Sequence, residues 1–151
     1  DINSVTRDAR VSALPHAERE NATIDLELND DLPSVWINEV EIEQVLTNLI
    51  DNASRSSDQP IRVVVRTETS KQGVRISVED DGPGMTDEQR QRAFDPFYST
   101  RHKQGGTGLG LSIAHGIIEG HGGTIEIGGE VGEGTIVMVD LPIHREDDKI
   151  E

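Results

Sequence analysis

A glycine-rich loop that leads directly into an apolar segment dominates the organisation of this chain. Residues 105–111 read Gly-Gly-Thr-Gly-Leu-Gly-Leu, and the apolar segment 112–118 follows without a break. Glycine tolerates positive φ angles and has no Cβ, so the backbone amides of such a loop can approach a ligand closely. A helix that begins there would direct unpaired N–H groups and the positive end of its dipole toward an anion. The pattern indicates a phosphate-binding loop, although a flexible linker has a similar composition.

The charge of the chain is strongly acidic but unevenly distributed. Its 151 residues form one domain of ordinary length with a net charge of −15, which argues against nucleic-acid binding because a duplex binder needs a basic surface. Between Pro96 and Ile118 there is no acidic residue, and Arg101, His102 and Lys103 lie together there. This balance fits an anionic ligand, as it would fit a solvated basic loop. The chain has no Cys and no apolar run of membrane-spanning length, so we expect a soluble protein without disulfides.

Hydrophobic periodicity predicts an alternation of strands and helices. We expect strands at 23–28, 61–67, 73–79, 124–127 and 135–141, with the second and third paired as an antiparallel hairpin. We expect helices at 38–54 with Asn38 as N-cap, at 109–119, and after a capping box formed by Thr86 and Gln89. Residues 2–19 read as a weakly amphipathic entering helix that Pro15 breaks.

The helix at 38–54 has an unusual polar stripe beside its apolar one. Gln44, Asn48, Asn52 and Arg55 fall within roughly 80° of one another at ~100° per residue. Exposed helix positions usually favour Lys and Glu, and Asn is a poor helix former. Two Asn one turn apart therefore suggest oxygen ligands for a cation or hydrogen bonds to a ligand. A solvated face is the alternative.

A second polar feature follows the strand at 73–79. Asp80 is followed by Gly82 and Gly84, so a carboxylate at a strand end precedes a Gly-x-Gly sequence. Such a carboxylate can accept hydrogen bonds at the mouth of a pocket while the glycines let a flat ligand approach. A plain Asp-Gly turn has the same residues. The aromatic cluster 94–98 suggests a packing anchor beside a mobile segment at 99–105.

Taken in order, four motifs resemble the N, G1, F and G2 boxes of the catalytic, ATP-binding domain of bacterial sensor histidine kinases. They are Asn48-Leu49-Ile50-Asp51-Asn52-Ala53, Asp80-x-Gly82-x-Gly84, Phe94-x-Pro96-Phe97 and Gly106-Thr107-Gly108-Leu109-Gly110-Leu111. Their order and spacing match over residues 23–141. Residues 96–101 also resemble the lid of the nitrogen-regulation type of sensor kinase.

The resemblance implies the Bergerat fold, an α/β two-layer sandwich. Its sheet would be mixed, mainly antiparallel and five-stranded, with three helices covering one face and ATP held between the helices and the lid. The order of strands and helices predicted above agrees with that fold. We expect an N-terminal linker or entering helix at 1–22, the ATP-binding catalytic domain at 23–143, and a charged flexible tail at 144–151.

The resemblance also implies roles for individual residues. Asn52 would ligate the magnesium ion that bridges the phosphates, Asn48 would support the phosphates or the metal, and Arg55 would reach the phosphates. Asp80 would accept a hydrogen bond from the exocyclic amine of adenine, and Thr135 would assist near the base. Further nucleotide-binding residues would be Gly82, Gly84, Tyr98, Thr100, Arg101, Lys103, Gly106, Thr107, Gly108, Leu109, Gly110 and Leu111, with Arg101 and Lys103 clamping the γ-phosphate from the lid.

Asn48 bears on the choice between relatives of the same superfamily. In the gyrase, mismatch-repair and chaperone ATPases this position holds a Glu that activates water, whereas an amide has no basic lone pair for that task. The resemblance therefore implies a kinase that transfers the γ-phosphate of magnesium-ATP to a histidine for relay to a response regulator. His16, followed by Ala17-Glu18-Arg19, does not match the phosphoacceptor motif, and we interpret all five His as structural or exposed. The acceptor would lie on a separate dimerisation domain of the same kinase.

Other functions remain open at this point. A serine protein kinase of the anti-sigma-factor type shares the Asn-rich and Gly-rich boxes, but typically has a weaker Phe box. A nucleotide-binding module without transfer activity is a second alternative, and a hydrolase is the least favoured because of Asn48. We expect ATP or ADP as ligand, a monomeric isolated domain, a homodimeric parent and a cytoplasmic location, whether or not the parent is membrane-anchored.

Overall fold

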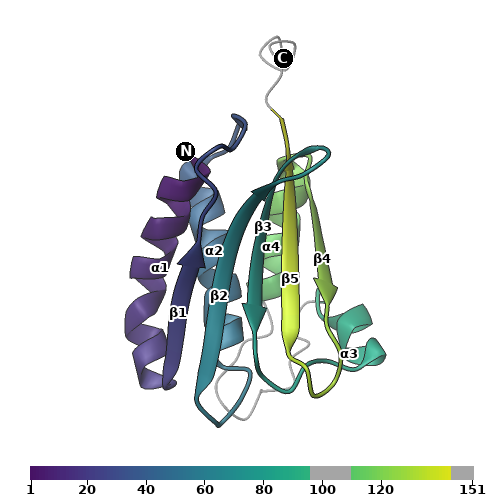
Figure 1. Ribbon diagram of the computed structural model, residues 1–151. Helices are drawn as coiled ribbons and strands as arrows, with labels where there is room; N and C mark the ends of the chain where they lie inside the picture. The colour runs from purple at the N-terminus through teal and green to yellow at the C-terminus, as the bar shows by residue number, and fades with distance from the viewer. Residues whose placement is uncertain (96–109, 144–151) are drawn as a thin grey trace.

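The computed structural model describes residues 1–95 and 110–143, which form a five-stranded sheet with helices on one face (Figure 1). The strands are β1 (Ala22–Glu27), β2 (Ile61–Thr69), β3 (Gly73–Asp80), β4 (Thr124–Gly128) and β5 (Thr135–Pro142). Their order in the sheet is β1-β2-β3-β5-β4. β1 pairs with β2 in parallel, and the other three pairings are antiparallel. The predicted mixed, mainly antiparallel sheet and the β2–β3 hairpin are confirmed.

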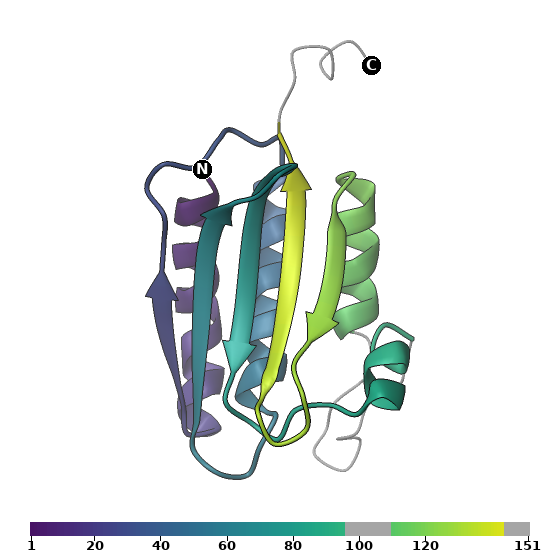
Figure 2. The same ribbon diagram turned by 45° about the vertical axis from the view of Figure 1, so that its right-hand side comes forward.

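Three long helices form the second layer. They are α1 (Ile2–Arg19), α2 (Glu39–Ser54) and α4 (Gly110–Gly120), and they cover the same face of the sheet (Figures 1 and 2). The short α3 (Asp87–Arg92) lies beside the end of β4 and begins with the predicted capping box of Thr86 and Gln89. The two-layer α/β sandwich is therefore confirmed. Among the residues described, no helix is both long and apolar enough to span a membrane.

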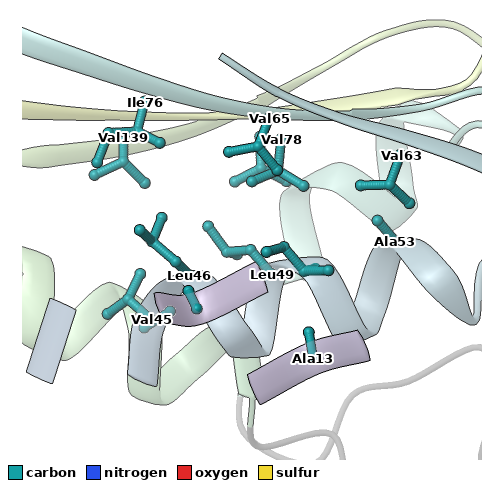
Figure 3. Packing of buried hydrophobic residues seen from close by; sticks show 14 of the residues in the cluster. Ala13, Val45, Leu46, Leu49, Ala53, Val63, Val65, Ile76, Val78 and Val139 are labelled. Carbon is teal, nitrogen blue, oxygen red and sulfur yellow. The ribbon is translucent and has the colours of Figure 1, made fainter. Parts of the chain in front are cut away.

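Helix α2 is the centre of the hydrophobic core. The Asn38 side chain accepts a hydrogen bond from the Glu41 N–H at 3.1 Å, which caps the helix as predicted. The apolar stripe is almost completely buried, with exposed fractions of 0 to 1% at Ile42, Val45, Leu46, Leu49 and Ile50. Figure 3 shows this stripe facing side chains of the sheet. Each such burial contributes about 1.5–3 kcal/mol to folding, so α2 is fixed firmly against β2, β3 and β5.

The prediction that Pro15 breaks the first helix is wrong. Helix α1 continues through Pro15 to Arg19. Proline removes the N–H that would bond to the Val11 carbonyl, but Val11 and Pro15 both lie on the exposed side, where water can solvate that carbonyl. Ala13 and Ala17, on either side of Pro15, are at most 1% exposed and pack into the core. Their packing holds the helix together against the local cost of the proline.

Helix α1 also shares its core with the rest of the described chain. Its buried side chains belong to the same hydrophobic cluster as α2 and the sheet, and the apolar ones are Ile2, Val5, Ala9, Ala13 and Ala17. The domain boundary after residue 22 stays a prediction, but α1 packs as an integral part of the layer of helices. The predicted tail at 144–151 lies outside the described residues.

Candidate functional site

Asp80, the last residue of β3, is a buried carboxylate at the edge of the core. It is 6% exposed, and its Oδ1 accepts a hydrogen bond from the Gly82 N–H at 2.9 Å. In the sheet Asp80 pairs with Thr135, the first residue of β5, so the two predicted base-binding residues are neighbours. Burial raises the pKa of the Asp80 carboxyl group, and hydrogen bonds from Gly82, Ser56 and Thr135 oppose this shift without cancelling it.

A small cavity connects Asp80 with the polar stripe of α2. Its volume is about 50 Å³, room for a water molecule or two rather than for an organic ligand. The cavity brings together four predicted site residues from four different elements: Asn52, Asp80, Leu111 and Thr135. The other lining residues are mostly apolar, namely Leu49, Ala53, Ser56, Val78, Met85, Ile127 and Val137. An apolar pocket with a few convergent polar groups is the usual form of a small-molecule site.

Close packing requires glycine at two positions after Asp80, against side chains at Gly82 and against backbone at Gly84. A Cβ at Gly82 would lie 2.5 Å from the Ser56 Oγ and 2.9 Å from the Asp80 Oδ1. Gly84 has a φ of +77°, and a Cβ there would overlap the Glu130 carbonyl oxygen. The loop after β3 therefore passes against the β4–β5 loop without space for side chains, which brings its backbone to the edge of the cavity.

Asn48 and Asn52 lie together on α2 and face the start of α4. Both are half-buried. A Cβ placed on Gly110, the first residue of α4, would lie 3.5 Å from the Asn52 Nδ2 and 4.0 Å from the Asn48 Cβ. The first N–H groups and the positive dipole end of α4 are therefore next to two side-chain amides. This arrangement can hold an anion at the helix terminus and an oxygen-coordinated cation beside it.

Arg55 is placed differently from the two Asn. Its Nε donates a hydrogen bond to the His16 Nε2 of α1 at 2.7 Å, and it is not among the described residues that line the Asp80 cavity. The sequence assigned no specific partner to His16. No local sequence pattern could predict this hydrogen bond, because 39 residues separate His16 from Arg55.

Ser56 is a further site residue that the sequence analysis missed. Its hydroxyl hydrogen-bonds the Asp80 carboxylate and lies 2.8 Å from the Ala53 carbonyl oxygen, so its single proton can be donated to either group. Ser56 lies three positions after the last residue of the N-box motif and two positions after the end of α2. A small hydroxylated residue at that point is the only local signal that could have identified it.

Some of the remaining predicted site residues lie outside the part of the chain that the structure describes. Phe94 of the F box stacks on His115 of α4, with ring centroids 5.0 Å apart, which agrees with its predicted role as a packing anchor. The structure does not describe residues 96–109. The predicted residues Tyr98, Thr100, Arg101, Lys103, Gly106, Thr107, Gly108 and Leu109 lie in that range, and their roles stay predictions.

Comparison with solved structures identifies close relatives of this fold. The nucleotide-free catalytic domain of histidine kinase ThkA superposes with a TM-score of 0.81 at 32% identity, covering 94% of this chain and 92% of that domain. ThkA in complex with the response regulator protein TrrA gives 0.78 at 28% identity, covering 95% and 41%. Full-length ShkA in complex with AMPPNP gives 0.82 at 29% identity, covering 94% and 30%.

Sequence comparison agrees with the structures. The alginate biosynthesis sensor protein KinB of Pseudomonas aeruginosa is 34% identical over 143 residues, which are 95% of this chain and 24% of KinB. The chain thus spans about a quarter of the length of that relative. A family model for the histidine kinase-, DNA gyrase B- and HSP90-like ATPases matches residues 37–145, which include α2, the Asp80 loop and α4. By its fold, the placement of its site residues and this match, the chain belongs to the histidine kinase-, DNA gyrase B- and HSP90-like ATPase family.

Proposed function

We propose that this chain is the catalytic domain of a sensor histidine kinase, which binds magnesium-ATP and transfers its γ-phosphate to a histidine on a separate phosphoacceptor domain. The observation that carries this proposal is the placement of buried Asp80 and Asn52 in one cavity, with Asn52 facing the glycine start of α4. A base-binding carboxylate and a phosphate-binding helix terminus are thus joined by a metal-binding amide. ShkA, a relative solved in complex with AMPPNP, supports nucleotide binding by this fold.

Asp80 would select the base. Its carboxylate can accept a hydrogen bond from the exocyclic amine of adenine, whereas guanine presents a carbonyl oxygen at the corresponding position and would be repelled. Thr135 lies opposite Asp80 in the sheet and would contribute a second polar group near the base. Gly82 and Gly84 have no side chains, so the backbone there can approach the base closely. The cavity would have to widen around the base, and Met85, a flexible lining residue, is suited to that movement.

Asn52 would hold magnesium, and Asn48 would support the phosphates or the metal. Mg²⁺ prefers oxygen ligands and is usually bound by one or two protein groups together with substrate phosphates, which fits an amide carbonyl beside a helix terminus. When bound, the ion would neutralise charge that develops on the phosphate oxygens. Arg55 and the cations of the undescribed segment, Arg101 and Lys103, would supply further positive charge.

Asn48 favours transfer to a protein acceptor over hydrolysis. An amide cannot deprotonate water, so the site lacks a general base at the position where related hydrolases carry Glu. An incoming neutral imidazole needs no such base: its nitrogen attacks the γ-phosphorus while the bond from phosphorus to the bridging oxygen of ADP breaks. The chain would then act by positioning the reactants and stabilising charge.

The partners follow from the same proposal. The phosphoacceptor and dimerisation domain would lie elsewhere in a longer polypeptide, since the chain spans about a quarter of KinB. A response regulator would receive the phosphoryl group, as the complex of ThkA with TrrA suggests. We expect this chain alone to be monomeric, its parent to be a homodimer, and both to place the site in the cytoplasm.

Calorimetric titration tests the proposal. The chain should bind AMPPNP and ADP, with affinity that falls when EDTA replaces magnesium. Asn52→Ala should abolish magnesium-dependent binding and transfer while leaving the fold intact. Gln44→Ala, on the exposed part of the same helix stripe, is the matched control and should behave like the unsubstituted chain.

Transfer itself can be followed with radiolabelled ATP and the phosphoacceptor domain supplied in trans. An acid-labile product is expected of a histidine kinase, and an acid-stable product would favour the serine kinase alternative. Binding without any transfer would leave only a nucleotide-binding module. Unchanged transfer by Asn52→Ala would overturn the assignment of the metal site.

A further inference from the structure

A hydrogen bond between two helices fixes the side chain of Arg55. Arg55 caps the C-terminus of α2, and its backbone N–H bonds to the Asp51 carbonyl oxygen at 3.1 Å. Its side chain turns toward α1, where Nε donates to the His16 Nε2 at 2.7 Å. Both side chains are half-buried. The backbone cap and the side-chain bond together hold the guanidinium group in one place at the α1–α2 contact.

The chemistry of this bond leaves the end of the guanidinium group available. Arginine stays protonated and can only donate, so the His16 Nε2 must be the unprotonated nitrogen and Nδ1 carries the ring hydrogen. The bond uses the Nε–H alone. The other four N–H donors make no hydrogen bond to any residue in ranges 1–95 and 110–143. The two terminal amino groups form the planar fork that suits bidentate binding of phosphate.

Arg55 is also correctly situated for a phosphate ligand. It follows Asn52 by three residues, so on a helix it lies on the same side as Asn52 and Asn48. Those amides face Gly110 at the start of α4, where the proposed phosphate site is. The bond to His16 holds only Nε, so the terminal amino groups at the end of this long side chain are the part that can reach the phosphates.

Asp51 supplies the competing interaction. It lies one turn before Arg55, and its Oδ1 is buried without a hydrogen-bond partner among the described residues. Burial raises the pKa of the Asp51 carboxyl group, and the positive charge of the nearby Arg55 opposes that shift. Without His16, the Arg55 guanidinium could pair with this carboxylate, since residues four apart on a helix are neighbours. Such a pair would occupy the N–H groups that a phosphate needs.

We propose that His16 is a positioning residue for nucleotide binding: by accepting the Arg55 Nε–H, it orients the two terminal amino groups of Arg55 toward the phosphates of ATP. This inference rests on the proposed function and extends it to α1, which contributes no residue to the Asp80 cavity. The ligand class is a nucleoside polyphosphate. The affinity for the base and ribose would not depend on His16.

The test compares affinities for AMPPNP and adenosine, both measured with magnesium by calorimetry. His16→Ala should weaken AMPPNP binding about threefold to tenfold, the range expected when one long side chain must be ordered by the ligand, and should leave adenosine binding unchanged. His16→Gln should restore most of the AMPPNP affinity, because the Gln Oε1 can accept from Arg55 in place of Nε2. In an Arg55→Ala background, His16→Ala should have no further effect.

Ser12→Ala is the matched control. The Ser12 hydroxyl donates to Glu43 at 3.0 Å across the same pair of helices, so this variant also loses an α1–α2 hydrogen bond but has no link to Arg55. It should bind AMPPNP like the unsubstituted chain. Thermal unfolding of each variant checks that α1 remains packed.

Several outcomes would overturn the role of His16. These are unchanged or tighter AMPPNP binding by His16→Ala, an equal loss for adenosine, or a loss that persists in the Arg55→Ala background. If the unsubstituted chain binds AMPPNP and His16→Ala binds equally well, only this inference fails. If the unsubstituted chain binds neither ligand, the proposed function fails as well.

Discussion

The two ends of the candidate site are built in different ways. At the proposed base end, Gly84 and Gly134 are in such close contact with neighbouring backbone that a Cβ on either of them would overlap a carbonyl oxygen. At the proposed phosphate end, a Cβ on Gly110 would make only ordinary contact with the described residues, at 3.5 Å from the Asn52 Nδ2. The backbone of the base end is therefore fixed by the fold, whereas the described part of the phosphate end tolerates an added methyl group. Under the proposed function, selection of the base and binding of the phosphates are separate tasks, and this close backbone packing preorganises the backbone for the first.

Gly134→Ala would break the base end most severely. Gly134 has a φ of +93°, and a Cβ there would overlap the Asp80 carbonyl oxygen. We expect the free energy of unfolding to fall by about 3 kcal/mol or more, from backbone strain plus displacement of β3. Urea denaturation followed by circular dichroism measures this.

Gly132→Ala separates the two contributions to that loss. Gly132 also has a positive φ, of +87°, but apart from its own chain neighbours no described residue has an atom within 4 Å of the position of its Cβ. The free energy of unfolding of Gly132→Ala should therefore fall only by the cost of the left-handed conformation, about 1–2 kcal/mol. Equal losses for the two glycines would contradict close packing as the cause.

Asp80→Asn would test whether the base end selects adenine. Replacing an ionised acceptor should weaken ADP and AMPPNP binding by about 2 kcal/mol, or roughly thirtyfold. Affinity for inorganic triphosphate should not change, because that ligand engages only the phosphate end. Calorimetric titration of both ligands gives the comparison, and a parallel loss for triphosphate would mean that the two ends are not separate.

The pH dependence of stability should reflect the same carboxylate. Because burial raises the pKa of Asp80, the folded state binds this proton more tightly than the unfolded state. Stability should therefore fall as the pH rises from the ordinary carboxyl pKa through the raised one, and this part of the fall should be missing in Asp80→Asn. Thermal unfolding of both proteins from acid to neutral pH measures the difference. Identical slopes would show that Asp80 titrates normally.

Gly110→Ala should have the smallest effect on folding. The added methyl group fits beside Asn52, and alanine is the better helix former, so the free energy of unfolding should rise by between zero and about 1 kcal/mol. AMPPNP affinity should nevertheless decrease, because the methyl group occupies space at the phosphate end. A large loss of stability would show that this end is as tightly packed as the base end.

The sequence predicted those parts of the molecule that depend on local pattern. The apolar stripe of α2, its Asn38 cap and the alternation in β3 and β5 each specify their element, and the sheet follows from them. The extent of α1 could not be predicted, since the packing of Ala13 and Ala17 decides that Pro15 is tolerated. The orientation of Arg55 depends on His16, which belongs to a different helix. Gly134 matters because it meets the Asp80 backbone, a contact between strands that only the fold creates.

The register of β3 with β5 has an evolutionary consequence. Val78 and Asp80 are two residues apart and therefore lie on the same face of β3, and Thr135 and Val137 likewise share a face of β5. All four residues line the cavity. The proposed base-binding row is therefore the continuation of the hydrophobic core, and a shift of one residue in the pairing would turn Asp80 to the opposite face of the sheet. An insertion of one residue within β3 or β5 would cause such a shift. Under the proposed function, substitutions that change the partners of this chain can therefore accumulate more freely than substitutions that change the base it binds.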